Sequence, residues 1–420
     1  MADVIDLPEL SLVVLLGTAG SGKSTFARRC FAATEVLSSD RFRAMITDDE
    51  ARQDVNADAF EALHLVADRR LKHRRLTVID ATNLETRARQ PLRRLAKQRQ
   101  VPTVVLALDV PQDECVARDR ARADRSVGAA VIREQRQRFE RSLGKLAEEG
   151  FRDVRVLSAA QVERATVART PLENDRRDLE GPFDVIGDVH GCAEELRALL
   201  SRLGWREEAG AHRHPGGRTA VFLGDLVDRG PDTPGVLRLV MAMVEAGTAL
   251  CLPGNHEAKL ARWLRGKRVK ESHGLEVSVA QLAREPEGFG ARVLAFIESR
   301  PSHYRLDGGA LVVAHAGLKE AFHGRTGGKV RSFCLYGDTT GEKDEHGLPI
   351  RLDWARDYEG EAVVVYGHTP VAEAVWVNET ICIDTGCVFG GKLTALRWPE
   401  RRLVQIPARR VHFEPPRPLA

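Results

Sequence analysis

The sequence predicts two successive α/β domains, and three observations support this prediction. The chain has 420 residues, a length that suits two or three domains with a core each. Short apolar runs alternate with amphipathic stretches in two separate series, which is typical of layered α/β folds. Between the series lies a polar segment, residues 164–182, with prolines and no apolar period. We therefore expect a first domain over residues 1–163, this segment as a linker, a second domain over residues 183–409, and a mobile tail over residues 410–420.

The bulk composition is typical of globular proteins. Hydrophobic residues make up 43% of the chain, and the net charge of +3 is too small to indicate a polyanionic partner by itself. Seven cysteines form no Cys-x-x-Cys pair, so we expect reduced thiols and no structural zinc. The first residues lack the pattern of a signal peptide, and no apolar run approaches the roughly 20 residues that span a bilayer. These features predict a cytoplasmic protein without a membrane partner.

The first series predicts a domain with a parallel sheet. Its apolar runs predict buried strands at Leu12–Leu16, Leu76–Asp80 and Thr103–Asp109. The amphipathic stretches between them predict helices at Ala57–Arg75 and Thr86–Arg99. Strands that alternate with helices in this way pair in parallel.

The second series starts at Phe183 and places polar clusters after its strands. Each apolar run ends in a group of Asp, His, Asn and Gly residues. Ligand groups at the carboxyl ends of strands are where an α/β sheet places its site. The predicted strands are Phe183–Ile186, Thr219–Leu223, Ala249–Leu252, Leu311–Ala314 and Ala362–Tyr366.

A glycine-rich loop follows the first predicted strand and opens a helical pattern. Residues 17–25 fit the P-loop pattern GxxxxGK[ST], in the strand–loop–helix context that the motif requires. Its backbone N–H groups surround phosphate oxygens, Lys23 reaches the β and γ phosphates, and Ser24 ligates Mg²⁺. The predicted nucleotide-binding residues are Gly17, Gly20, Ser21, Gly22, Lys23, Ser24 and Thr25.

Two aspartates lie at the ends of neighbouring predicted strands. Asp40 can accept a proton from an attacking hydroxyl, or it can cap the helix that follows. Asp80 ends a strand that resembles a Walker B strand and would help to hold Mg²⁺, or it can form a turn. The residues alone leave both alternatives open.

A basic helix is predicted at Gln112–Arg125. Arg118, Arg122 and Arg125 share one face of it, because side chains four and seven residues apart align on a helix. Such a row suits a lid that clamps triphosphate charge, and its alternative is a solvated basic face.

The strongest signal lies in five blocks of the second series. They are Gly187–Gly191 (GDVHG), Gly224–Gly230 (GDLVDRG), Gly254–Glu257 (GNHE), His315–Gly317 (HAG) and Gly367–Pro370 (GHTP). Carboxylates, imidazoles and one amide oxygen suit two divalent metals. The blocks and their order resemble the calcineurin-like metallophosphoesterases.

This resemblance implies a role for each residue of the blocks. Asp188 and His190 would bind one metal, Asp225 would bridge both, and the second metal would take Asn255, His315 and His368. The same resemblance implies that His256 donates a proton to the leaving oxygen and that Asp228 orients His256. It also implies that Arg229 holds a phosphate oxygen. Asp384 ends another strand nearby, and a turn-forming aspartate is an equal alternative for it.

Taken together, the two motif sets resemble the bacterial polynucleotide kinase–phosphatases of RNA repair. The resemblance rests on the P-loop, the Asp40–Arg43 block, the arginines that follow Cys115 and the metal set, and it covers about residues 10–400. It implies a P-loop kinase domain and a metallophosphoesterase α/β sandwich.

The same resemblance implies the chemistry at each site. Asp40 would be the general base for a 5′-hydroxyl, Arg43 would contact the acceptor, and Arg118 and Arg122 would clamp ATP, with Arg125 beside them. The kinase would use ATP and Mg²⁺. The phosphoesterase would use two divalent metals, with Mn²⁺ favoured, to remove 2′ and 3′ phosphates from RNA or DNA ends. The chain shows no Lys-x-Asp-Gly motif, so a separate ligase is expected to seal the ends.

The motifs fix the chemistry more firmly than the substrate. The metal blocks also resemble protein serine/threonine phosphatases and dinucleoside tetraphosphatases, either of which would here be fused to a P-loop ATPase or kinase. A nucleotide-dependent interaction module is a further alternative. The sequence leaves the oligomeric state open, a homodimer included.

Overall fold

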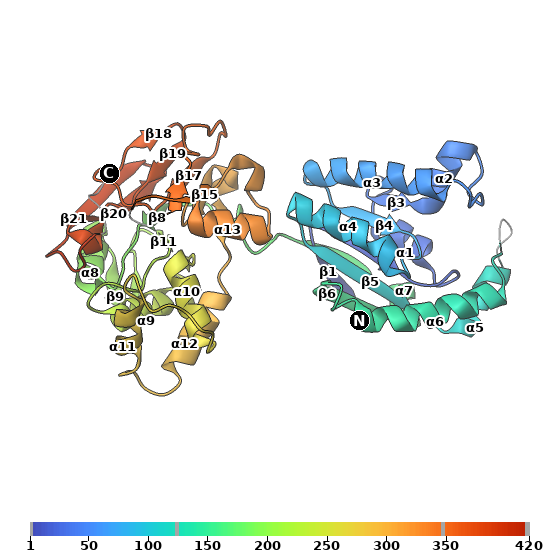
Figure 1. Cartoon of the computed structure of the whole chain (residues 1–420), viewed down its shortest axis with the longest axis horizontal. Helices are drawn as coiled ribbons and strands as arrows, with labels where there is room; N and C mark the ends of the chain where they lie inside the picture. Colours follow the sequence, from blue (N-terminus) through green and yellow to red (C-terminus); the bar gives the residue numbers. More distant parts are fainter. Residues whose placement is uncertain (1–2, 122–125, 346–348, 416–420) are drawn as a thin grey trace. The chain divides into compact units, whose positions relative to one another are not determined.

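The computed structural model describes residues 3–121, 126–345 and 349–415. These residues form two compact units, Met1–Leu172 and Glu173–Ala420, each with its own sheets and helices (Figure 1). The two-domain α/β prediction is confirmed.

A parallel five-stranded sheet forms the centre of the first unit. Its strand order is β3-β4-β2-β5-β6, and every pair is parallel. The strands are β2 (Leu12–Leu16), β3 (Val36–Ser38), β4 (Thr77–Asp80), β5 (Thr103–Asp109) and β6 (Asp153–Ser158). β2 and β5 have their predicted bounds, and β4 begins one residue later than predicted.

Helices cover both faces of this sheet (Figure 1). Alternate residues of β2 point to opposite sides: Leu12, Val14 and Leu16 pack with α3 and α4, whereas Val13 and Leu15 pack with α1 and α7. The helices are α1 (Lys23–Cys30), α2 (Ser39–Thr47), α3 (Asn56–Lys72), α4 (Thr86–Arg99), α5 (Gln112–Arg120), α6 (Ala129–Lys145) and α7 (Ala159–Arg164).

The predicted basic helix is shorter than expected. α5 ends at Arg120, and the next residue, Ala121, is its C-cap. Arg118 therefore lies in the last turn of the helix. Arg122 and Arg125 lie outside the described residues, so the predicted row of three arginines is not placed by the structure.

The segment between the units differs from the predicted linker. Thr166–Thr170 forms β7, which pairs in parallel with β1 (Val4–Pro8) and belongs to the first unit. Asn174 is buried in the second unit, where its Nδ2 donates to the carbonyl of Arg325 at 3.1 Å. Polar and charged residues on an edge strand carry no apolar period, so the pattern missed β7.

Two five-stranded sheets pack face to face in the second unit. The first has the order β12-β11-β8-β20-β21, and the second has the order β13-β14-β17-β19-β18. Apolar residues of both sheets, among them Val185, Val221, Val313 and Ile383, form the core between them. The strands are β8 (Phe183–Ile186), β11 (Thr219–Phe222), β12 (Ala249–Cys251), β20 (Lys392–Trp398), β21 (Arg402–Pro407), β13 (His303–Leu306), β14 (Leu311–Ala314), β17 (Val363–Tyr366), β18 (Trp376–Val377) and β19 (Thr380–Cys382).

Helices cover the outer faces of the two sheets. α8, α9, α10 and α12 share a core with the first sheet, and α13 packs on the second. The helices are α8 (Ala193–Leu203), α9 (Thr233–Glu245), α10 (Asn255–Leu264), α11 (Leu275–Leu282), α12 (Phe289–Glu298) and α13 (Gly328–Tyr336). The smaller elements are the hairpins β9–β10 (Arg206–Glu208, Ala211–Arg213) and β15–β16 (Thr339–Lys343, Pro349–Arg351) and the 3-10 turns Asp307–Gly309, Glu320–Phe322 and Cys387–Phe389.

The start of the predicted mobile tail is packed against the second unit. The backbone N–H groups of His412 and Phe413 both donate to the carbonyl of Val388 at 3.0 Å. His412 Nε2 lies 3.0 Å from a carboxylate oxygen of the buried Glu195. Among the described residues, no helix is both long and apolar enough to cross a bilayer.

Candidate functional sites

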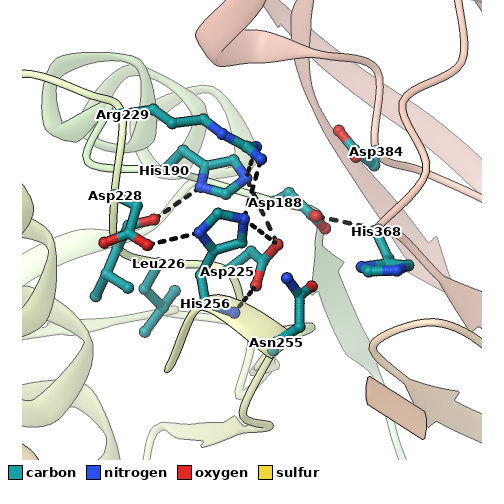
Figure 2. Close-up of polar contacts among 12 residues, drawn as sticks. Asp188, His190, Asp225, Leu226, Asp228, Arg229, Asn255, His256, His368 and Asp384 are labelled. Atoms are coloured by element: carbon teal, nitrogen blue, oxygen red, sulfur yellow. Dashed lines mark hydrogen bonds and ion pairs between the residues drawn. The ribbon is translucent and has the colours of Figure 1, made fainter. Parts of the chain in front are cut away.

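Every metal ligand predicted from the five blocks follows a strand of the second unit at its carboxyl end. The two central sheets therefore carry the ligands to one edge, where they meet (Figure 2). The ligands are Asp188 and His190 after β8, Asp225 after β11, Asn255 after β12, His315 after β14 and His368 after β17.

One group of donor atoms gathers around His315. Its Nε2 lies 3.0 Å from Asn255 Oδ1, 3.0 Å from His368 Nδ1 and 3.5 Å from Asp225 Oδ1. His315 Nδ1 lies 3.2 Å from the carbonyl of Leu223, which can only accept, so Nδ1 carries the proton and Nε2 presents a lone pair. Lone pairs on an imidazole nitrogen, an amide oxygen and a carboxylate oxygen thus converge without a hydrogen between them. A divalent cation fits this set.

A second group shares Asp225. His190, Asp225 and His256 place one donor atom each within 4.8 Å of one another. His190 Nδ1 lies 2.7 Å from the carbonyl of Val227, so its Nε2 carries no proton and presents a lone pair, 3.5 Å from Asp225 Oδ2. Asp225 therefore stands between both groups, as a bridging ligand would.

Asp188 lies at the same site, beside His368, and its role as a metal ligand with His190 stays a prediction. The donor atoms of His190 and Asp225 group with that of His256. Asp188 Oδ2 accepts from the backbone N–H of His368 at 3.0 Å, and its buried Oδ1 has no partner among the described residues. An orphaned carboxylate oxygen in a buried site is a position that a cation would satisfy.

The charges at this site call for positive compensation. Burial, then the neighbouring charge of Asp384, raises the pKa of Asp188 well above its usual range. Burial raises the pKa of Asp225 in the same way and lowers the pKa of His315 to about 3. The imidazoles are neutral, as ligation requires, and a bound cation would offset the crowding of negative charge and favour the ionised carboxylates that ligate metals.

Five residues of the site hold unusual backbone conformations. His190, Asp225, Asp228, Arg229 and His368 all have positive φ angles, between 45° and 73°. Residues other than glycine rarely adopt this conformation, because Cβ approaches the carbonyl oxygen. Strain of this kind concentrates at functional sites, where the surrounding structure holds it in place.

Two motif glycines allow carboxylates to approach the backbone. A Cβ on Gly254 would lie 2.0 Å from Asp225 Oδ1, and a Cβ on Gly367 would lie 2.1 Å from Asp188 Oδ1. Any side chain at either position would displace a ligand carboxylate.

The predicted acid and its carboxylate are in direct contact. His256 Nδ1 lies 2.6 Å from Asp228 Oδ2, and Arg229 Nη2 donates to His256 Nε2 at 3.0 Å (Figure 2). Arg229 Nη1 also donates to His190 Nε2 at 2.7 Å. The guanidinium thus lies over the metal donors, where a substrate phosphate would meet it.

Glu257 is a site residue for which the sequence analysis gave no role. Its carboxylate accepts from the backbone N–H groups of Asp225 and Leu226 at 2.8 Å each and of Gly254 at 2.7 Å. It therefore fixes the loop after β11 to the loop after β12. A glutamate three residues after the N-cap position was the available signal, because that is a capping-box position.

Asp384 combines the two alternatives that the sequence left open. Its Oδ1 accepts from the backbone N–H of Gly386 at 3.1 Å, which is a turn-forming contact. It is also buried against Asp188, and burial raises its pKa to about 6.

The P-loop of the first unit has the predicted setting. It joins β2 to α1, and Lys23 Nζ donates to the carbonyls of Gly17 and Thr18 at 3.0 and 2.6 Å. Asp80, at the end of β4, accepts a hydrogen bond from Ser24, and burial raises its pKa. The predicted Mg²⁺ residues are thus adjacent.

Arg43 supports Asp40 rather than reaching toward solvent. Its guanidinium forms an ion pair with Asp40 and donates to the carbonyl of Glu50 at 2.7 Å and to Asn56 Oδ1 at 2.9 Å. The side chain of Arg43 is 5% exposed, whereas that of Asp40 is 43% exposed. Asp40 is the member of the pair that an acceptor hydroxyl can reach.

α5 and α6 both contact the P-loop. A Cβ on Gly22 would lie 3.5 Å from Arg118 Nη1, so this guanidinium is next to the loop. Arg118 also pairs with Glu163 at 2.8 Å. Gln135 of α6 was not predicted: its Oε1 accepts from the backbone N–H of Ala19 at 2.7 Å.

Two family matches divide the chain much as the structure does. Residues 12–142 match a family described as an AAA domain, and residues 181–398, just over half of the chain, match the calcineurin-like phosphoesterases. Curated relatives share the second part and are named bis(5′-nucleosyl)-tetraphosphatase PrpE, asymmetrical.

Three of these relatives show the extent of the similarity. The proteins of Anoxybacillus flavithermus and Bacillus subtilis are each 46% identical over 230 residues, and that of Halalkalibacterium halodurans is 47% identical over 231 residues. Each match covers 54% of this chain and 94% of the relative. Because so little of each relative is left unmatched, these proteins have no counterpart of the P-loop unit.

Proposed function

This chain belongs to the calcineurin-like phosphoesterase family. From that membership together with the fused P-loop unit, we propose that it heals broken nucleic-acid ends. The first unit transfers the γ-phosphoryl group of ATP to a 5′-hydroxyl, and the second removes a 2′, 3′ or cyclic phosphate from the opposite end. ATP with Mg²⁺ serves the first reaction, and two divalent metals, with Mn²⁺ favoured, serve the second.

The geometry of the second unit supports the hydrolytic half. Metals held by the two donor groups around Asp225 would neutralise phosphate charge and activate water for attack on phosphorus. The planar fork of Arg229 suits two oxygens of the same phosphate. Asp228 holds the Nδ1 side of His256 at 2.6 Å, which leaves Nε2 facing the site. Protonated at Nε2, with the phosphate in place of its contact with Arg229, His256 would pass that proton to the leaving oxygen.

The geometry of the first unit supports the transfer half. Asp40 would take the proton of the 5′-hydroxyl as it attacks, while Lys23 and Arg118 stabilise the charge on the phosphates. The released proton would move to the Asp40 carboxylate, and the bond from the γ-phosphorus to ADP would break. Phosphoryl transfer needs mainly this positioning and charge neutralisation.

One observation carries the proposal: a P-loop with an accessible Asp40, itself fixed by a buried arginine, is fused to a dimetal phosphoesterase. Asp40 lies in the first turn of α2, directly after β3. An ATPase that serves as a switch does not need a fixed, solvent-facing carboxylate at this position. A base beside the phosphates has a function when a hydroxyl acceptor binds there. The relatives without the P-loop unit lack this half of the chemistry.

The test uses a broken RNA with a 5′-hydroxyl and a 2′,3′-cyclic phosphate, incubated with ATP, Mg²⁺ and Mn²⁺. Mass spectrometry of both ends should find a 5′-phosphate and free 2′ and 3′ hydroxyls. Asp40→Asn should lose only the first change, and Asp225→Asn only the second. Release of the γ-phosphate to water, with no transfer to RNA, would reject the kinase assignment. When both ends are healed as proposed, a separate ligase would join them.

A second candidate for the second unit is hydrolysis of dinucleoside tetraphosphates. The specific support is the name of relatives that are 46% identical over 230 residues. Comparing kcat/KM for diadenosine tetraphosphate with kcat/KM for a 3′-phosphorylated RNA separates the two. A value at least tenfold higher for the tetraphosphate, which is about 1.4 kcal/mol of transition-state preference, would favour the second candidate.

A further inference from the structure

A cavity of about 220 Å³ opens beside the dimetal site of the second unit. Its wall includes His368, which is a predicted metal ligand, so the cavity and the metal site are continuous. We propose that this cavity binds the nucleoside that carries the reacting phosphate, with an apolar wall for the base and Arg351 for the adjacent phosphate of the chain. The inference rests on the proposed nucleotide chemistry of this site.

The apolar wall is rigid and partly open to solvent. Trp354 and Tyr366 line it, with ring centroids 5.1 Å apart, and Leu352 closes the wall with 49% of its surface exposed. Trp354 packs directly on the loop of His315, because a Cβ on Gly317 would lie 2.0 Å from its ring. The wall is therefore fixed relative to the metal ligands, and an exposed leucine at the mouth is available to a flat apolar ligand.

Arg351 places a fixed positive charge in the same cavity. Its Nη1 donates to the carbonyl of Tyr336 at 2.6 Å, which holds the side chain in place. Arg351 and the predicted metal ligand His368 line the same cavity, so the guanidinium and the metal site face one space. A guanidinium near the site of the reacting phosphate can bind a second phosphate of the same ligand.

The acidic residues of the cavity are neutralised. Asp338 lies 2.5 Å from Lys319 Nζ, and Asp353 lies 2.7 Å from Arg356 Nε. The charge of each of these two carboxylates is therefore offset by a neighbouring cation, which lowers the repulsion of an anionic ligand. The volume of about 220 Å³ is below the roughly 300–1,000 Å³ of pockets for drug-sized ligands, so it suits one nucleoside rather than a folded partner.

Two variants separate the two parts of the cavity. Leu352→Ala removes exposed apolar wall, and Arg351→Met removes the charge but keeps a long apolar stem. Arg292→Met is the control, because Arg292 is an exposed arginine of α12, 64% exposed and paired with Glu245. The substrates are glycerol 2-phosphate, which has no base, uridine 3′-monophosphate, and a 3′-phosphorylated uridine dinucleotide, which adds a second phosphate.

We expect Leu352→Ala to lower kcat/KM about tenfold for both nucleotides, and Arg351→Met to lower it about tenfold for the dinucleotide only. For both variants, kcat/KM for glycerol 2-phosphate should stay within twofold of the wild-type value. For Arg292→Met, kcat/KM should stay within twofold of the wild-type value for all three substrates. Binding of uridine 3′-monophosphate is also measured by calorimetry on the metal-free chain. The chain carries Lys23→Ala in this experiment, so that nucleotide binding by the P-loop of the first unit is reduced. Leu352→Ala should weaken the binding, and Arg292→Met should leave it unchanged.

Two results would overturn the inference. If wild type hydrolyses all three substrates and neither variant changes the ratio of dinucleotide to glycerol phosphate activity, the cavity does not bind the nucleoside, while the proposed function stands. If wild type hydrolyses a phosphopeptide but neither nucleotide, the proposed function fails, and the nucleoside assignment fails with it.

Discussion

Arg43 holds the Asp40 carboxylate in place, and one substitution can test this positioning role. The guanidinium is buried and reaches Asp40, the carbonyl of Glu50 and Asn56 at once, so it holds the carboxylate in one orientation. Lysine keeps the charge but lacks the planar fork that makes these contacts together. Asp40 would then sample several orientations beside the acceptor hydroxyl.

We therefore expect Arg43→Lys to lower kcat for 5′ phosphorylation roughly 100-fold, the scale of a 1 Å misplacement of a catalytic group. Phosphatase activity of the same protein should stay at the wild-type level, which shows that the chain remains folded. Arg41→Lys is the matched control, because Arg41 is exposed on the same helix and should keep full kinase activity. Equal losses in both variants would contradict the positioning role.

The dimetal site predicts that cations stabilise the second unit as well as activate it. Its donors are buried carboxylates and neutral imidazoles, and Asp188 Oδ1 has no partner among the described residues. A cation that binds only the folded state at 100 times its Kd adds about 2.7 kcal/mol to the free energy of unfolding.

Calorimetry should therefore show the second unit unfolding at a lower temperature after chelation, and Mn²⁺ should restore it. Asp225→Asn should abolish the gain from Mn²⁺, because Asp225 belongs to both donor groups. Lys23→Ala should leave that gain unchanged. A Tm that does not respond to Mn²⁺ in wild type would show that the donors do not form a cation site.

Elements that follow a strong apolar period were predicted closely, and the others were missed for a common reason. β2, β5 and α4 have their predicted bounds because buried parallel strands and amphipathic helices leave clear patterns. β7 and the packed tail have few apolar residues, and backbone pairing holds both in place. Such pairing depends on partners far along the chain, which a local pattern does not record.

The metal blocks were predictable as a set, but their detailed grouping was not. Each block follows a strand end, so the fold brings all of them to one edge. The contact of His256 with Asp225, and the three backbone bonds to Glu257, depend on how the loops cross after the strands. Sequence order carries no information about that crossing.

The tail contact predicts a defined pH dependence of stability. Burial alone would raise the pKa of Glu195, but the hydrogen bonds from His412 and from the backbone N–H of Arg409 outweigh it and lower that pKa. A carboxylate with a lowered pKa in the folded state contributes stability above its unfolded pKa of about 4.3 and loses it as the pH falls through the folded value.

Glu195→Gln should therefore lower the Tm of the second unit at pH 7, and the difference from wild type should shrink as the pH falls below about 4.3. Thermal unfolding across this range measures it. Glu194→Gln on the same helix is the control, because Glu194 is exposed and its ion pair with Arg409 is at the surface, where such pairs contribute about 0–1 kcal/mol. A difference that grows toward low pH would contradict the assignment.

At the scale of the whole molecule, each of the two units is compact by itself, and the curated relatives match one of them. The relatives consist almost wholly of the second part, since each match covers 94% of the relative and 54% of this chain. A chain of this kind should hydrolyse its substrate without the P-loop unit. The position of the boundary, however, decides whether the separated part is stable.

We expect residues 173–420 to fold and to retain phosphatase activity, and residues 183–420 to be less stable. The shorter piece lacks Asn174, whose buried Nδ2 donates to His303 Nε2 at 2.9 Å and to the carbonyl of Arg325 at 3.1 Å. A net hydrogen bond contributes about 0.5–1.5 kcal/mol, so denaturant unfolding should show a loss of about 1–3 kcal/mol when both are removed. Asn174→Ala in residues 173–420 should reproduce much of the loss. If residues 183–420 match the longer piece in stability, the segment before Phe183 is a simple linker after all, because the contacts of Asn174 would then contribute nothing to folding.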